Sequence, residues 1–172
     1  MAQRFLARTG GKTRQLEAKA TSAGAADAGK IPALDSSGKL DMSMMPAGIG
    51  ADTQILPASE ALSAGNLVNI WSDGGVAKVR LADNSNGRAA DGYVLDAVAS
   101  AADATVFPLD GTNSELTGLT PGAEYWLGTA GGVIAVPLDE TDSANANKIS
   151  QYLGKAKSAT ELITEDDGYV IL

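Results

Sequence analysis

The sequence predicts an all-β protein: a compact β-barrel or sandwich of two similar hairpin-based halves, preceded by an extended N-terminal arm. Two observations lead to this prediction. A pattern of turn, strand, Gly-Gly turn and strand occurs at Leu62–Val79 and again, 57 positions later, at Leu119–Val136. Residues 1–51 lack this pattern and any regular apolar period. We therefore expect an arm over residues 1–51 and a body over residues 52–172.

The repeated stretch is predicted to form a β-hairpin in both copies. Paired glycines accept the positive φ angles that tight hairpin turns need, and the upstream Leu-x-x-Gly is predicted to be a turn that starts the strand. The alternative is that such Gly-Gly hairpins are simply common in β proteins. Six identities share the offset: Leu62, Gly65, Gly74, Gly75, Val76 and Val79 recur as Leu119, Gly122, Gly131, Gly132, Val133 and Val136.

The similarity extends beyond the hairpins. Gly92–Ala101 resembles Gln151–Thr160 at an offset of 59. Each half then closes with an apolar strand, at Thr105–Leu109 and at Tyr169–Leu172. We therefore expect pseudo-repeats over about residues 60–109 and 117–172.

The remaining parts of the body are predicted to be short strands and loops. Thr53–Pro57 is the expected entry strand, because its apolar residues directly precede the first repeat. Leu81–Asp91 is predicted to be a polar loop with several turn formers, and Leu138–Asn147 is predicted to be a long exposed loop.

The arm is predicted to be extended, with at most a few helical turns around Leu16–Ala20, because glycines interrupt any longer helix. Its apolar residues distinguish it from a free disordered tail. We expect it to lie across a partner's surface; the alternative is that it folds back on its own body. The side chains predicted to contact the partner are Phe5, Leu6, Ile31, Leu34, Leu40, Met44 and Met45.

Composition limits the chemistry. The chain has no cysteine and no histidine, which excludes thiol nucleophiles, disulfides, the usual zinc ligands and the commonest general base. Aromatic residues make up only 5% of the chain, so the core is light and burial against neighbouring subunits would add stability. We expect no enzymatic activity, no cofactor and no metal site.

Charge is divided unevenly along the chain. Residues 1–20 carry five basic side chains and one acidic side chain, whereas residues 51–172 carry 6 basic and 17 acidic ones. The acidic body argues against nucleic-acid binding. The basic arm suits an acidic surface or nucleic acid, or it is a solvated tail. No apolar run reaches the ~18 residues of a membrane span, and the first 15 residues lack a signal-peptide core.

Three features of the sequence are candidate ligand-binding sites. Gly24–Ile31 has the G-x4-G-K frame of a phosphate loop, but Ile31 replaces the Mg²⁺-binding Ser or Thr and Pro32 blocks the following helix. The carboxylate clusters Asp139–Asp142 and Glu165–Asp167 do not fit a calcium-binding EF-hand loop and favour solvated loops. The two tryptophans are expected in the core or an interface.

The two repeated stretches are LSAGNLVNIWSDGGVAKVRLAD, from Leu62, and LTPGAEYWLGTAGGVIAVP, from Leu119. Both resemble the small β-barrel capsid decoration (cement) proteins of tailed bacteriophages. The segment AGKIPALDSSGKLDMSMMP, from Ala28, resembles the arm segment that precedes such modules, and similar segments occur in phage tail fibres. The similarity covers roughly residues 20–172.

The resemblance implies a non-enzymatic virion protein on the outer surface of the capsid, made in the bacterial host cytoplasm. Its partners would be the major capsid protein and itself, as a homotrimer, with no nucleic acid and no membrane. Similar modules occur in fibres and spikes, so a tail-fibre or head-spike module that binds a host receptor is the first alternative. A polysaccharide-degrading enzyme with paired carboxylates is the second, which the poverty of aromatic residues disfavours.

Overall fold

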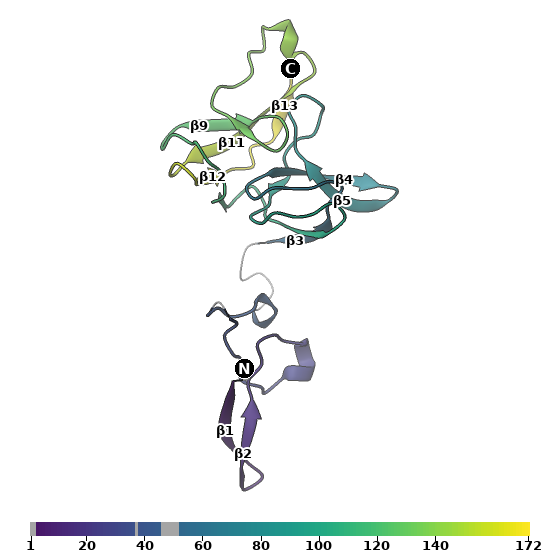
Figure 1. The fold of residues 1–172 in the computed structure, drawn as a ribbon. Coiled ribbons are helices and arrows are strands. Elements are labelled where there is room, and N and C mark those ends of the chain that lie inside the picture. The colour runs from purple at the N-terminus through teal and green to yellow at the C-terminus, as the bar shows by residue number, and fades with distance from the viewer. Residues whose placement is uncertain (1–2, 37, 46–51) are drawn as a thin grey trace. The chain divides into compact units, whose positions relative to one another are not determined.

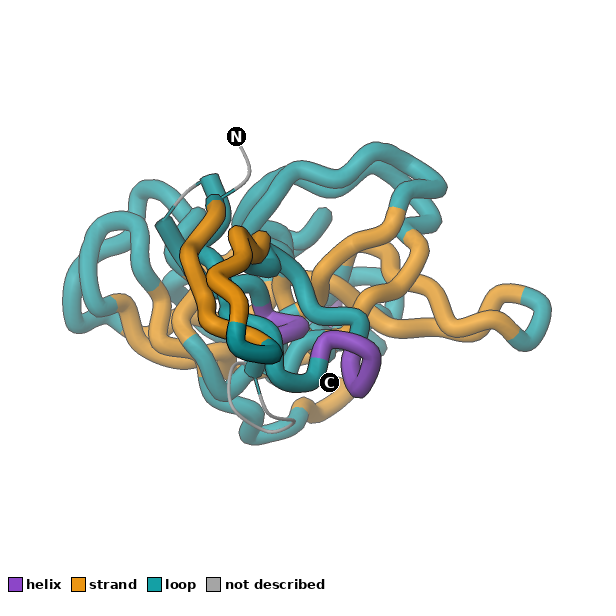
Figure 2. The backbone as a smooth tube through the Cα atoms, turned by 90° about the horizontal axis from the view of Figure 1, so that it is seen from below, coloured by secondary structure: helices purple, strands orange, loops and turns teal. Residues whose placement is uncertain are grey.

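A computed structural model of the chain describes residues 3–36, 38–45 and 52–172. The chain divides into two units, residues 1–50, called here the N-terminal unit, and residues 51–172, called the body (Figure 1). Strands and loops make up nearly all of the described chain, as Figure 2 shows. The only helical elements in the described ranges are three short 3-10 turns: η1 (Gly24–Asp27), η2 (Met42–Met44) and η3 (Ser143–Asn145).

The predicted all-β class is confirmed, since all pairs of named strands are antiparallel and the described residues contain no α-helix. The strands form several open sheets, and no closed barrel is found among the described residues.

In the N-terminal unit, β1 (Arg4–Thr9) and β2 (Lys12–Glu17) form a hairpin. Gly10 and Gly11 make its two-residue turn, with φ angles of 60° and 76°. The helical turns predicted around Leu16–Ala20 are wrong, because pairing with β1 overrides the weak local helix propensity.

The first half of the body has a simple strand order. β3 pairs with β7, and β4 lies between β5 and β6. Tyr93 and Phe107 exchange backbone N–H···O bonds of 2.9 Å, which join β6 to the end of β7. The order is therefore β3–β7–β6–β4–β5. The bounds are β3 (Gln54–Pro57), β4 (Leu67–Asp73), β5 (Val76–Leu81), β6 (Gly92–Tyr93) and β7 (Asp103–Val106).

The second half repeats that order as β8–β12–β11–β9–β10, within a single sheet. One additional strand, β13, pairs with the start of β11 and has no counterpart in the first half. The bounds are β8 (Thr112–Asn113), β9 (Glu124–Leu127), β10 (Val133–Ile134), β11 (Ile149–Ala156), β12 (Leu162–Thr164) and β13 (Tyr169–Ile171).

Backbone hydrogen bonds align the two halves. The Gly65 N–H donates to the Val94 carbonyl and the Gly122 N–H donates to the Ala156 carbonyl, both at 2.8 Å. Gly65 and Gly122 share a φ of 82°. Val94 and Ala156 are 62 positions apart, so the bonds do not follow the predicted offset of 59.

Glycine at two matching positions explains this alignment. A Cβ atom built on Gly92 would collide with the Phe107 carbonyl, and one built on Gly154 would collide with the Ile163 carbonyl. Each glycine thus permits a close approach of backbone that no other residue allows. Gly154, rather than Gln151, therefore takes the place of Gly92.

The two repeated hairpins differ at their turns. Asp73 lies opposite Val76 around the tight Gly74–Gly75 turn, as predicted. In the second copy Leu127 lies opposite Val133, which leaves five residues in the loop. The tight turn of the second copy falls on Ala130 and Gly131, with φ angles of 51° and 74°, rather than on Gly131 and Gly132, and the Gly132 N–H closes it by donating to the Thr129 carbonyl at 3.0 Å.

The wider second loop packs onto the first half of the body. The Leu67 N–H donates to the Gly131 carbonyl at 2.9 Å, and the Gly131 N–H donates to the Ala82 carbonyl at 2.7 Å. Gly131 thus lies in the turn of the second hairpin and also joins the two halves through its N–H and its carbonyl.

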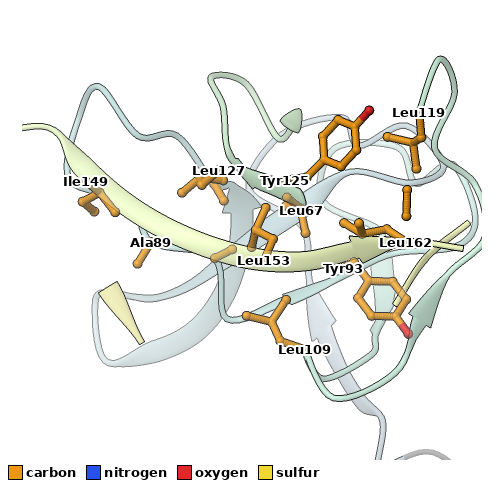
Figure 3. Packing of buried hydrophobic residues seen from close by; sticks show 13 residues of the cluster. Leu67, Ala89, Tyr93, Leu109, Leu119, Tyr125, Leu127, Ile149, Leu153 and Leu162 are labelled. Carbon is orange, nitrogen blue, oxygen red and sulfur yellow. The ribbon is translucent and has the colours of Figure 1, made fainter. Parts of the chain in front are cut away.

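The core has two clusters that meet at β4. The larger draws on both halves and includes Leu67, Tyr93, Leu127, Leu153 and Leu162 (Figure 3). The smaller lies within the first half and includes Val68, Val79, Val94, Ala104 and Val106. Successive residues of a strand point to opposite faces, so adjacent residues of β4 supply both clusters.

Gly131→Ala tests the docked loop. Gly131 has a φ of 74°, and a Cβ there would lie 2.9 Å from Leu81 Cδ2 and 3.0 Å from the Leu67 carbonyl oxygen. We expect the free energy of unfolding to fall by about 2–4 kcal/mol from backbone strain and overpacking. Chemical denaturation measures it.

The matched control is Gly122→Ala, which has a φ of 82° and no atom within 4 Å of the added Cβ. It should cost about 1 kcal/mol, from conformation alone. Equal losses in the two variants would contradict the docking role of Gly131.

Candidate partner-binding surface

The N-terminal unit buries almost none of its apolar side chains. Among its described residues the one buried hydrophobic side chain is the small Ala33, 7% exposed. Leu6 is 74% exposed and Leu34 is 49% exposed. A unit of this composition lacks the buried area that stabilises an independent domain.

The predicted contact residues are divided by the structure. Five are exposed: Leu6, Ile31, Leu34, Leu40 and Met45. Phe5 and Met44 are partly buried. Leu16 is also exposed, although the local sequence predicts a helical turn for it, because it lies opposite Phe5 in the hairpin. These eight residues are called here the arm surface.

Lys19 links the hairpin to the segment that follows it in the N-terminal unit. Its backbone N–H donates to the Ile31 carbonyl at 2.9 Å, and its carbonyl accepts from the Ala33 N–H at 2.6 Å. Its Nζ lies 3.4 Å from Asp27 Oδ1. The bonds fix residues 31–33 beside the end of β2, so Ile31 and the hairpin belong to one folded unit. A hollow of about 190 Å³ lies there, lined in part by Lys19, Ile31, Pro32 and Met44.

The G-x4-G-K frame does not form a phosphate loop. Gly24–Asp27 is a 3-10 turn, and Asp27 accepts the Ala23 N–H at 2.8 Å. This backbone hydrogen bond is the main reason that the pKa of Asp27 lies below its usual value. The Asp27 carboxylate therefore accepts a backbone N–H of the kind that a bound phosphate would need. The G-x4-G-K frame thus has a structural role.

The hairpin of the N-terminal unit carries an exposed positive charge. Arg4, Arg8, Lys12 and Arg14 lie on it with one acidic residue, Glu17. All residues of β2 are exposed. Such a surface favours an acidic partner at low ionic strength.

The first of the two carboxylate clusters of the body, Asp139–Asp142, stabilises its own loop. Asp139 accepts the backbone N–H and the hydroxyl of Thr141, at 2.8 and 2.7 Å. Asp142 caps η3 by accepting the Ala144 N–H at 2.9 Å. Among the described residues, no group of three or more acidic side chains is placed to hold a metal ion.

The two tryptophans make contacts within the body. Trp71 donates from Nε1 to Ser59 Oγ at 2.9 Å, and the Arg80 guanidinium lies 4.7 Å from its ring centroid. Trp126 packs edge-on against Tyr152, with ring centroids 5.7 Å apart. Both are half-buried, so each serves as a partly exposed anchor of its hairpin.

Asp91 is the body's most unusual carboxylate. Its Oδ2 accepts the Ile70 N–H at 2.7 Å and Asn69 Nδ2 at 3.0 Å. Asp91 keeps an exposed side, and desolvation of the rest of the carboxyl raises its pKa above the ordinary value against the lowering effect of the two hydrogen bonds, with the Asp166 carboxylate adding to the rise. The Asp91 carboxylate thus holds the backbone of β4 through its hydrogen bonds, although its surroundings disfavour the negatively charged form.

The sequence matches no model of a known protein family and no curated protein. Within the ranges that the structure describes, none of the helices is long and apolar enough to cross a membrane.

Asp91→Asn tests this electrostatic cost. A folded-state pKa above the unfolded value means that the contribution of Asp91 to stability is present at low pH and lost as pH rises through the folded pKa. The asparagine retains an acceptor oxygen without the charge. We expect the variant to be more stable than the parent chain at pH 7, with the gain shrinking toward pH 3.

Denaturant unfolding at both pH values measures the effect. Asp139→Asn is the control, since hydrogen bonds from Thr141 lower the pKa of that carboxyl and the sign should reverse. A destabilised Asp91→Asn at pH 7 would contradict the interpretation.

Proposed function

We propose that the chain is a non-enzymatic structural protein of a tailed-phage virion. It acts as a decoration (cement) protein, which binds the major capsid protein on the outer surface of the head and bridges capsomers. The observation that supports this most is the arm surface, an apolar set of side chains on a unit without a core of its own.

The energetic argument favours a partner that covers this unit. Burying one large aliphatic side chain contributes about 1.5–3 kcal/mol. The arm surface has several such side chains, among them Ile31, Leu34 and Leu40. Ordering about 50 residues costs conformational entropy. Burial of these side chains offsets that cost only when a partner supplies the rest of the core. The basic hairpin adds attraction to an acidic capsid surface.

The body would serve as the outward-facing part of the subunit. Its shared strand order and matching glycines support two copies of one hairpin-based unit, built from open sheets rather than a closed barrel. Its net charge of −11 over residues 51–172 suits a surface that faces solvent rather than nucleic acid. A homotrimer at a symmetry axis of the head is the assembly we propose.

The rival is a tail-fibre or head-spike module that binds a host receptor. It would use the loops at residues 81–91 and 138–147 as the contact surface. In the first loop Asp83 accepts the Ser85 N–H at 2.9 Å and the Ala130 N–H at 3.1 Å, so the loop is held in shape. Copy number per virion separates the two functions, because a decoration protein covers the head and a fibre occupies few sites.

The test replaces two arm-surface residues in the full chain, Ile31→Glu with Leu34→Glu. Both side chains are exposed, while the backbone bonds of this segment do not depend on them. We expect occupancy of expanded phage heads, measured by co-sedimentation, to fall at least about a hundredfold, since two lost apolar contacts are worth about 3 kcal/mol or more.

The matched control is Ala25→Glu with Ala26→Glu, which adds the same charge to exposed positions on η1. Its occupancy should stay within a factor of a few of the parent chain. Equal loss in both variants, or unchanged occupancy after deletion of residues 1–50, would overturn the role of the arm surface.

A further inference from the structure

The C-terminal strand β13 is an uncovered apolar edge of the body. It pairs with β11 through Ile149–Gln151 and, among the described residues, with no strand on its other side. Tyr169, Val170 and Ile171 are 53%, 60% and 66% exposed. Alternate residues point to opposite faces, so neither face of this strand lies against a core. Such an edge readily pairs with another strand.

The hairpin of the N-terminal unit has an edge of the same kind. Beyond the end of β2, the backbone of Lys19 bonds to residues 31–33, whereas β1 pairs with β2 alone among the described residues. β1 has the apolar centre Phe5–Leu6–Ala7 between Arg4 and Arg8. An isolated two-stranded hairpin is marginally stable in water, so a third strand would stabilise it.

We propose that β1 of one copy adds to β13 of a second copy as an antiparallel strand. With Leu6 opposite Val170, the two apolar centres meet. The basic tip of the hairpin, with Arg8 and Lys12, then lies beside the acidic segment Glu165–Asp167 that precedes β13. Backbone hydrogen bonds supply affinity, and the opposite charges set the direction and register.

Charge favours this occupant over pairing of two β13 strands. Two β13 edges would bring together bodies that each carry a net charge of −11 over residues 51–172, and each edge follows the acidic segment Glu165–Asp167. The hairpin, in contrast, carries four basic residues and one acidic residue over residues 4–17. The electrostatic attraction is thus between the basic hairpin of one copy and the acidic segment that precedes β13 of another copy.

A donor edge and an acceptor edge on one chain make a head-to-tail interface. Such an interface closes into a ring when the rotation between copies permits. Ring closure on a head rests on the proposed function. It divides the arm surface between two partners. Phe5 and Leu6 contact a neighbouring copy, whereas Ile31, Leu34 and Leu40 contact the head.

Cysteine pairing tests the contact in the full chain without heads. The chain has no native cysteine, so Leu6→Cys and Val170→Cys can be made on separate chains, one of them with a mass tag. Opposed residues of neighbouring strands have the Cα separation that a disulfide requires. We expect mild oxidation of the mixture to give mainly the mixed-mass dimer, on non-reducing gels.

The matched control is Gln15→Cys mixed with Val170→Cys. Gln15 lies opposite Leu6 on β2, on the same face but one strand further from a docked β13. Its yield should be about tenfold lower, because the separation of two strand spacings exceeds disulfide geometry. Equal yields from Leu6→Cys and Gln15→Cys would overturn the proposal.

Two other outcomes would also overturn it. A dominant Val170–Val170 cross-link would show that β13 pairs with itself. A double-substituted chain that closes only an internal disulfide, as a monomer, would show that the hairpin serves its own body. Because heads are absent, neither outcome bears on head binding.

A charge exchange provides a second measurement without cysteine. Arg8→Glu should shift the sedimenting species of the full chain toward the monomer, and Asp166→Arg should do the same. The double variant should regain the parent distribution, since it restores an opposite-charge pair. Failure of the double variant to recover would contradict the register proposed.

Discussion

Leu67 joins the two halves of the body, and the fold depends on it. Its N–H donates to the Gly131 carbonyl of the second half at 2.9 Å, and its own carbonyl accepts from the Ala82 N–H at 3.0 Å. Its side chain is fully buried in the larger core cluster. One residue at the start of β4 thus takes part in strand pairing, in the joint between the halves and in core packing, so displacement of the second hairpin loop would disturb all three.

Buried amides complete the joint where strands do not pair. Asn84 Nδ2 donates to the Leu127 carbonyl at 2.8 Å, and Asn113 Nδ2 donates to the Gly65 carbonyl at 2.9 Å. Gln151 both accepts the Ala90 N–H and donates to the Ala90 carbonyl. In the described residues no buried side-chain polar atom lacks a partner. Since an unmet buried polar group costs about 1–3 kcal/mol, these amides specify how one half lies on the other as well as stabilising it.

The sequence was informative where structure is local and misleading where it depends on distant contacts. The turns at Gly65 and Gly122 follow from glycine in the left-handed region. The offset of 62 was hidden, because Gly154 is required by the close approach of the Ile163 carbonyl on β12, and the sequence does not show that β11 and β12 pair. For the arm surface, apolar residues without a period were sufficient to find exposed side chains, but Leu16 needed knowledge of the β1–β2 register.

The contrast between the two units bears on how such a protein would work. The body has two core clusters and matched polar groups, whereas the described part of the N-terminal unit buries one alanine. A segment that gains its core only from a partner pays its ordering cost on binding, so its affinity per unit area is lower and its attachment is more sensitive to the partner's surface. For a decoration protein this division would be useful. The body would hold its own fold before assembly, and the N-terminal unit would become fixed only where a head surface and a neighbouring copy both cover it.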